Sequence, residues 1–169
     1  MTDVGFERAV REHKDRVHTY AVWMLGEREE ARDVSQEALV RLWQHRERVH
    51  EPAARTWLMR TTHHLCIDRL RRRSARPEVA VENLAFALPD GKPSPERSST
   101  SEQLGRAIKG ALASLSPRDR SIVLMREVQG MAYEQIATVL DLPLGTLKAT
   151  LHRCREKLRQ ELSQAGIVP

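Results

Sequence analysis

The chain has 169 residues, a formal net charge of +5, 30% charged residues and only 4% aromatic ones. This length suffices for one ordinary domain or two small ones, and scarce aromatics beside abundant helix formers argue against a β-rich sandwich or barrel. The two cysteines, Cys66 and Cys154, lie far apart, so no disulfide framework is expected and a reducing compartment fits. Without a secretory leader or an apolar run of ~20 residues, we expect a cytoplasmic protein with no membrane insertion of its own.

The positive charge is concentrated in two stretches of the chain. Residues 1–76 and 102–169 are each net positive, whereas 77–101 are net negative. A basic surface attracts polyanions such as nucleic acid, but many basic proteins bind none. Whether this chain binds nucleic acid therefore has to be judged from how its basic residues cluster locally.

The apolar pattern divides the chain into three parts. Helical periodicity runs from about residue 6 to 73 and again from about 104 to 162. The stretch between them holds half of the prolines, Asp90-Gly91 and several serines, which is typical of a linker. We therefore expect an all-α protein of two small helical domains, 1–76 and 102–169, joined by a flexible linker at 77–101.

Three helices are predicted in the first domain. The first covers about 6–24 and ends at Gly26, a residue that tolerates left-handed backbone geometry. The second starts among Glu27, Glu29 and Glu30, acids that suit the positive end of a helix dipole, and runs to about residue 45. The third covers about 55–73, after the break at Pro52, and ends in basic residues.

The second domain begins with a strong helix start. Ser116-Pro117-Arg118-Asp119 combines a serine cap, a proline in the first turn and an acid three residues after the cap. An apolar run at 122–125 is expected to be buried, and Gly130 ends it. A short helix at 132–140, a turn at 141–143 and a final helix at 145–163 follow.

The last three elements have the proportions of a helix-turn-helix unit. On the final helix one face is apolar and a second carries Lys148, His152, Arg155 and Arg159. The first face can pack while the second approaches phosphates and base edges in a major groove. The alternative is a solvated charged face on a structural helix. The apolar face consists of Leu147, Leu151, Cys154, Leu158 and Leu162.

The third predicted helix ends in a dense basic cluster. Arginines bind phosphates through two parallel hydrogen bonds, and exposed rings such as Trp57 can stack on unpaired bases. An ordinary basic helix end, favoured by the negative pole of the dipole, is the alternative, and Trp57 could equally belong to the hydrophobic core. The cluster and its neighbours are Asp68, Arg69, Arg71, Arg72, Arg73 and Arg76, preceded by His63 and His64.

The second predicted helix carries a mixed polar face beside a tryptophan. Asp33, Glu37, Arg41 and Gln44 share this face, next to Trp43. Tryptophan and arginine are frequent anchors of protein interfaces, so the face suits docking on a partner. A plain solvated face is the alternative.

Six sequence segments resemble one known family. Residues 33–43 (DVSQEALVRLW), 56–60 (TWLMR) and 68–73 (DRLRRR) resemble region 2 of the extracytoplasmic-function (ECF) sigma factors. Residues 112–120 (LASLSPRDR), 133–137 (YEQIA) and 145–155 (GTLKATLHRCR) resemble region 4 of the same family. The segments stand in the family's order, with the expected linker between them.

This resemblance implies a promoter-recognition subunit that binds core RNA polymerase and promoter DNA, with an anti-sigma factor as a regulatory partner and without a cofactor. Core-polymerase contacts are implied for Asp33, Gln36, Glu37, Arg41 and Trp43. Recognition and melting of the −10 element are implied for Trp57, Arg60, His63, His64, Arg69, Arg71, Arg72 and Arg73. Reading of the −35 element is implied for Thr146, Lys148, Ala149, Thr150, His152, Arg153 and Arg155.

Several positions differ from the pattern of this family. His64 stands where asparagine is frequent and Ala54 where an aromatic residue is frequent, both near the pocket for a flipped −10 base. Ala149 and Thr150 follow Lys148 where a Ser-Arg pair is common. The resemblance therefore implies the role but not the promoter sequence.

Two other classes of protein remain as alternatives. A helix-turn-helix repressor or response-regulator output domain would use the second domain but needs a dimer interface or an effector pocket. A metal enzyme or sensor could use His63, His64 and Cys66, although two ligands on one helix face fall short of a tetrahedral site. We find neither a nucleophile-and-base arrangement nor a phosphate-cradling glycine loop, so we expect no enzymatic activity and no catalytic residue or metal site.

Overall fold

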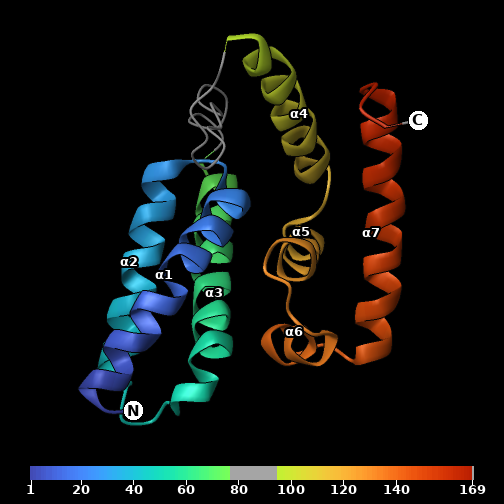
Figure 1. Ribbon diagram of the computed structural model, residues 1–169. Helices are drawn as coiled ribbons and strands as arrows, with labels where there is room; N and C mark the ends of the chain where they lie inside the picture. The colour runs from blue at the N-terminus through green and yellow to red at the C-terminus, as the bar shows by residue number, and fades with distance from the viewer. Residues whose placement is uncertain (77–94, 169) are drawn as a thin grey trace.

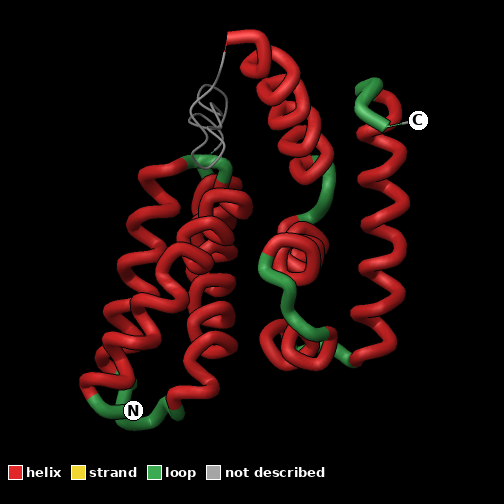
Figure 2. Tube along the Cα trace, in the orientation of Figure 1, coloured by secondary structure: helices red, strands yellow, loops and turns green. Residues whose placement is uncertain are grey.

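Helices make up the regular structure of the described part of the chain. The computed structural model describes residues 1–76 and 95–168. Within these ranges every regular element is helical (Figure 2), which confirms the expected all-α class. Most of the expected linker, 77–94, lies outside the described residues.

The first domain is a three-helix bundle. α1 (Asp3–Leu25) ends at Gly26, whose φ of 71° is the left-handed geometry expected there. α2 (Arg28–Gln44) starts at Glu27, whose carboxylate accepts hydrogen bonds from the backbone N–H groups of the next turn. A 3₁₀ turn, η1 (Glu51–Ala53), leads into α3 (Ala54–Ser74). The acidic side chains at the start of α2 thus have two effects. Glu27 accepts hydrogen bonds from otherwise unpaired N–H groups, and the negative charges interact favourably with the positive end of the helix dipole.

The second domain contains four helices and one π-helical turn. Its elements are α4 (Pro95–Ala113), α5 (Pro117–Val123), the π turn η3 (Leu124–Val128), α6 (Tyr133–Leu140) and α7 (Leu144–Gln164). The bounds of α6 and α7 agree with the helix-turn-helix prediction to within one residue at each end.

The caps explain where these helices start. Ser116 accepts a hydrogen bond from the Asp119 N–H at 3.1 Å, as the sequence predicts. Ala132 has no side-chain acceptor, but the side chain of Gln135 accepts from the Ala132 N–H at 3.0 Å. α6 ends at Asp141, whose φ of 54° turns the chain tightly toward α7. Half of a capping box therefore starts α6 without a side-chain acceptor at the N-cap position.

α4 begins earlier than the sequence predicts. We expect the linker to extend to residue 101, whereas the helix already starts at Pro95. Proline suits the first helical position, because its missing N–H would be unpaired there. The serines and threonine at 98–101 are weak helix formers, which is why composition alone indicates a linker.

The two domains lie against each other. α5 and α6 lie between α3 and α7 (Figure 1), and both α5 and α6 pack against α3. The buried side chains of both domains belong to one continuous apolar cluster. Its largest fully buried members are Tyr20, Met24, Leu42, Leu58, Met59, Ile122, Leu124, Met125, Met131, Ile136, Leu147 and Leu151.

No described helix is long and apolar enough to cross a membrane.

The Ser116 cap provides a test of this local account. Ser116→Ala removes the acceptor for the Asp119 N–H, so we expect the free energy of unfolding to fall by about 1 kcal/mol. Ser116→Asp keeps an acceptor and should retain wild-type stability. Urea unfolding of the three proteins checks this, and equal midpoints for Ser116→Ala and wild type would contradict it.

Candidate nucleic-acid interface

The basic end of α3 is only partly free. Arg71 and Arg72 are exposed, and Arg69 is half-buried. Arg73 donates to the Leu25 carbonyl at 2.7 Å and forms an ion pair with Glu30, so its guanidinium ties α3 to the start of α2. Arg72 and Arg76 are therefore exposed to a polyanion, and Arg71 would give up only a 3.9 Å ion pair with the exposed Asp68 of its own helix.

The middle of α3 carries the other residues implied for the −10 element. Arg60 and His64 are exposed, whereas Trp57 and His63 are half-buried. The ring of Trp57 lies 5.8 Å from that of His45 between centroids. Trp57 is thus partly buried against the apolar cluster of the bundle, and its contact with unpaired bases stays a prediction.

The half-buried ring of His63 is paired with a tyrosine of α1. Its Nδ1 lies 3.1 Å from the Tyr20 hydroxyl, and Tyr20 is fully buried. Burial, with a smaller effect of neighbouring His64, lowers the pKa of His63 to about 4. Burial also raises the pKa of the Tyr20 hydroxyl well above its usual value. The pair is therefore neutral at physiological pH.

Cys66 lies close to this pair and is fully buried. Burial raises the pKa of its thiol to about 12, which disfavours the thiolate that would bind a metal. Among the described residues, no group of three or more histidine, cysteine or acidic side chains is placed to hold an ion.

The polar face of α2 is open to a partner. Asp33, Gln36 and Arg41 are exposed and Glu37 is half-buried. Glu37 and Arg41 form an ion pair at 2.5 Å along the helix. Trp43 is 40% exposed, so an apolar ring stands at the end of this charged face.

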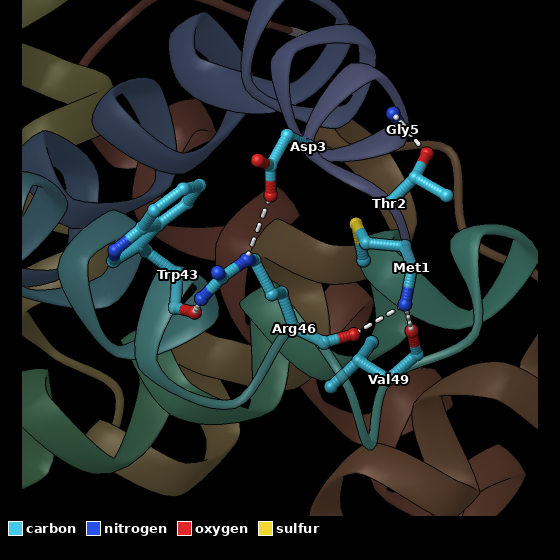
Figure 3. A network of polar contacts seen from close by, with 7 residues as sticks. All are labelled: Met1, Thr2, Asp3, Gly5, Trp43, Arg46 and Val49. Carbon is cyan, nitrogen blue, oxygen red and sulfur yellow. Dashed lines mark hydrogen bonds and ion pairs between the residues drawn. The ribbon is translucent and has the colours of Figure 1, made fainter.

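The position of Trp43 is fixed by the start of α1 (Figure 3). Its ring meets Phe6 edge to face at 4.9 Å, and the Arg46 guanidinium lies 3.7 Å above it. Arg46 also donates to Asp3 at 3.0 Å and to the Trp43 carbonyl at 3.0 Å. The amino group of Met1 donates to the carbonyls of Arg46 and Val49, which closes the network. The sequence pattern does not indicate this support, because its partners are about forty residues apart.

α7 presents the expected basic face to solvent. Thr146, Lys148, Ala149, His152, Arg153 and Arg155 are all exposed. Thr150 is buried instead, at 4% exposure, next to Leu147, Leu151 and Cys154 on the packed side of the helix. Its hydroxyl accepts a hydrogen bond from Arg153 at 3.3 Å, so it can position that arginine.

Two residues near this face were not identified from the sequence. Glu127 forms an ion pair with Arg155 at 2.5 Å, and the Tyr133 ring lies under the Arg126 guanidinium at 4.5 Å. The Lys148 ammonium lies 5.9 Å from the same ring. These contacts orient the basic side chains before any ligand binds. The roles of Glu127 and Tyr133 depend on contacts between helices, which the local sequence pattern does not show. Only Tyr133 could have been identified from the sequence, because it belongs to a segment that resembles region 4.

A polar cleft of about 480 Å³ lies between α1 and the start of α3. Within the described part of the chain, the Nδ1 of His13 and the Nε of Arg55 have no hydrogen-bond partner although both atoms are buried. The acidic and basic side chains around the cleft balance, so its charge selects no ligand. The lining residues are Arg8, Glu12, His13, Glu51, Pro52 and Arg55.

Two family models match this chain. A model described as Sigma-70 region 2 matches residues 9–76, which covers most of the first bundle. A model described as Sigma-70, region 4 matches residues 105–158, which includes the helix-turn-helix unit.

Characterised relatives cover nearly the whole chain. It is 36% identical over 162 residues to the ECF RNA polymerase sigma factor SigL of Mycobacterium tuberculosis, covering 92% of this chain and 88% of SigL. It is 31% identical over 160 residues to SigE of Mycolicibacterium smegmatis, an ECF RNA polymerase sigma factor, covering 95% of this chain but only 62% of SigE. The solved structure of the sigma factor RpoE from Bartonella quintana, in complex with the anti-sigma factor NepR, superimposes with a TM-score of 0.76 at 20% identity. That match covers 94% of this chain and 96% of RpoE.

His63 makes the stability depend on pH. Its pKa is about 4 in the folded protein, against 6.5 for a free side chain, so its neutral form contributes fully above pH ~6.5. As the pH falls toward 4 the unfolded chain binds the proton first, and we expect wild type to lose about 2.5 kcal/mol relative to His63→Gln between pH 7 and 4.5. Urea unfolding of both proteins at the two pH values measures this difference. Parallel pH dependences would contradict the burial of His63.

Proposed function

The chain belongs to the ECF sigma factors of the sigma-70 family, and we propose that it directs promoter-specific initiation by engaging core RNA polymerase, the −10 element and the −35 element with three separate surfaces. The ordered pair of region 2 and region 4 matches is the observation that carries this proposal. The polymerase supplies the chemistry of RNA synthesis, and this chain acts without a catalytic residue in the cytoplasm, where the polymerase works.

The −35 surface is proposed to be the solvent face of α7. Lys148, His152 and Arg155 are exposed along it, and Thr146 and Ala149 stand near its start. Residues near the N-terminus of a recognition helix reach deepest into the major groove, while the later basic residues meet phosphates. Glu127 and Tyr133 support the proposal, because they limit the motion of Arg155 and Lys148 before DNA arrives.

The −10 surface is proposed to be the exposed part of α3. Arg71 and Arg72 would bind phosphates, and Trp57 and His64 would lie against unpaired bases. Arg73 supports this surface from within, because it fixes the end of the helix to α2. His63 and Arg69 stay in the proposed set as half-buried neighbours.

The surface for core RNA polymerase is proposed to be the exposed face of α2. Asp33, Gln36, Glu37 and Arg41 supply charges and hydrogen-bonding groups, and Trp43 supplies an apolar anchor. Tryptophan and arginine frequently carry much of the binding energy at such interfaces. The rigid contacts of Trp43 with Phe6 and Arg46 support this role, since a preordered side chain loses less entropy on binding.

An anti-sigma factor is the proposed regulator. The structure of RpoE was solved in complex with the anti-sigma factor NepR, and that of CnrH in complex with the cytosolic domain of CnrY. A partner that covers the α2 face of this chain would prevent it from joining the polymerase.

Transcription from unselected DNA tests the proposed function. The chain is mixed with sigma-free core RNA polymerase and fragmented host DNA, and the 5′ ends of the RNA are sequenced. We expect defined start sites that share a pair of upstream motifs. Absence of such sites, together with no comigration with the core enzyme, would contradict the proposal and favour a DNA-binding regulator.

Charge reversal tests the polymerase surface. In Asp33→Lys/Glu37→Lys, we expect affinity for core RNA polymerase to fall at least tenfold, because two acids of the proposed interface become cations. The fold should persist, since losing the exposed Glu37–Arg41 ion pair and placing like charges one turn apart each cost only about 0.5 kcal/mol. Binding is measured by titration of labelled chain with core enzyme. Asp15→Lys/Glu47→Lys, at two other exposed acids, serves as control, and equal affinities for both double variants would contradict the assignment.

Neutralising two arginines tests the −10 surface. In Arg71→Ala/Arg72→Ala, we expect weaker promoter opening and a salt dependence whose log–log slope is smaller by about 1.5, because two phosphate contacts no longer release counterions. Open-complex formation by the reconstituted holoenzyme is measured between low and moderate salt. Arg11→Ala/Lys14→Ala, with the same charge change on α1, should keep the wild-type slope. An unchanged slope in Arg71→Ala/Arg72→Ala would remove this segment from the DNA path.

A further inference from the structure

A carboxylate lies against the arginine in the middle of α7. Glu127 belongs to the π turn η3, and its Oε1 accepts a hydrogen bond from the Nε of Arg155 at 2.7 Å. The same oxygen lies 2.5 Å from the Nη2 of that guanidinium. The hydrogen bond to Glu127 is the largest cause of the raised pKa of Arg155. One edge of this guanidinium is therefore occupied within the second domain, although Arg155 is proposed to meet DNA.

A tyrosine gathers two further cations beside this ion pair. The Tyr133 ring, at the start of α6, has its centroid 4.5 Å from the Arg126 guanidinium and 5.9 Å from the Lys148 ammonium. A hydrogen bond with the Tyr133 side chain also contributes to the raised pKa of Arg155. Three cations from η3 and α7 thus surround one ring. Glu127 brings a negative charge into a surface that is otherwise suited to a polyanion.

The carboxylate of Glu127 opposes general attraction to DNA. Its charge repels phosphates, and an arginine that is already paired releases fewer counterions when it meets one. The side chains of Arg155 and Glu127 are 47% and 46% exposed, so their ion pair contributes little to the stability of the fold. Neither affinity for DNA as such nor stability therefore accounts for the position of Glu127.

We propose that Glu127 determines specificity at the −35 element by restricting Arg155 to one phosphate position. The inference rests on the proposed function, in which α7 reads this element. With Nε and Nη2 directed at Glu127, Arg155 presents its Nη1 to a phosphate in one direction. DNA in the correct register meets Nη1 without disturbing the ion pair. In another register Arg155 would have to leave Glu127, and the phosphate would approach an unpaired carboxylate, which penalises the wrong complex.

Removal of the charge at Glu127 tests the inference in the reconstituted holoenzyme. Glu127→Gln keeps an acceptor of the same shape but frees Arg155 to follow a phosphate in any register. On a promoter fragment with a scrambled −35 element, we expect affinity to rise about fivefold, the upper range for one exposed ion pair. The log–log salt slope on that fragment should steepen by about 0.9, because one more cation releases counterions. Affinity for the intact promoter should stay nearly unchanged, so discrimination between the two fragments falls.

Competition binding at several salt concentrations measures both affinities, with a promoter found by the transcription experiment above. In the Arg155→Ala background, Glu127→Gln should no longer lower the discrimination, because the loss of repulsion then favours both fragments alike. Glu102→Gln, the same charge change at an exposed residue of α4, should discriminate as wild type does. Urea unfolding of Glu127→Gln should match wild type, whereas a role in the fold alone would lower stability and weaken both complexes.

The results separate this inference from the proposed function. A loss of discrimination in Glu127→Gln that disappears without Arg155 would support the inference. Equal discrimination by Glu127→Gln and wild type would overturn it and leave the proposed function intact, as would a loss that persists in Arg155→Ala. A wild-type holoenzyme that binds both fragments equally, or a chain that yields no defined start sites, would contradict the proposed reading of the −35 element, and the inference would fall with it.

Discussion

α3 is packed on two sides, and this double packing determines which of its residues can meet a ligand. One side of this helix completes the three-helix bundle through residues such as Leu58 and Thr62, and α5 and α6 pack against it as well. Only the remaining surface, with Arg60, His64, Arg71 and Arg72, is free for a ligand. The same helix thus serves stability, contact between the domains and the proposed grip on DNA, and a change in one affects the others.

The packing of α3 also separates the arginines that make contacts inside the fold from those that stay at the surface. Arg73 donates hydrogen bonds within the first domain, and Arg120 donates mainly to carbonyl groups around the contact between the domains. Arg16 and Arg55 both donate to the Gln129 carbonyl. The arginines of α7 instead stay at the surface, where acidic or hydroxyl partners orient them. A basic chain is therefore not uniformly a DNA-binding chain, and the structure separates the arginines that build the fold from those free to bind.

Local signals predicted most of the fold. The left-handed end of α1 at Gly26, the cap at Ser116 and the turn at Asp141 were predictable because each depends on neighbours within a few residues. The start of α4 was not, since residues 98–101 are weak helix formers. For the site, the exposed face of α7 followed from its periodicity, whereas the burial of His63 and Thr150 depends on helices distant in sequence. The resemblance supplied the roles of the surfaces, which periodicity and charge alone left open.

In the proposed function, one chain reads two separated DNA elements and opens the duplex at one of them. Chemical footprinting of a promoter fragment with the chain and core RNA polymerase, using a probe for unpaired thymines beside a backbone-cleavage probe, tests both properties in one experiment. We predict two separate protected segments on the promoter fragment, with unpaired thymines only in the downstream segment. A single protected segment, or two protected segments without unpaired thymines, would contradict the account.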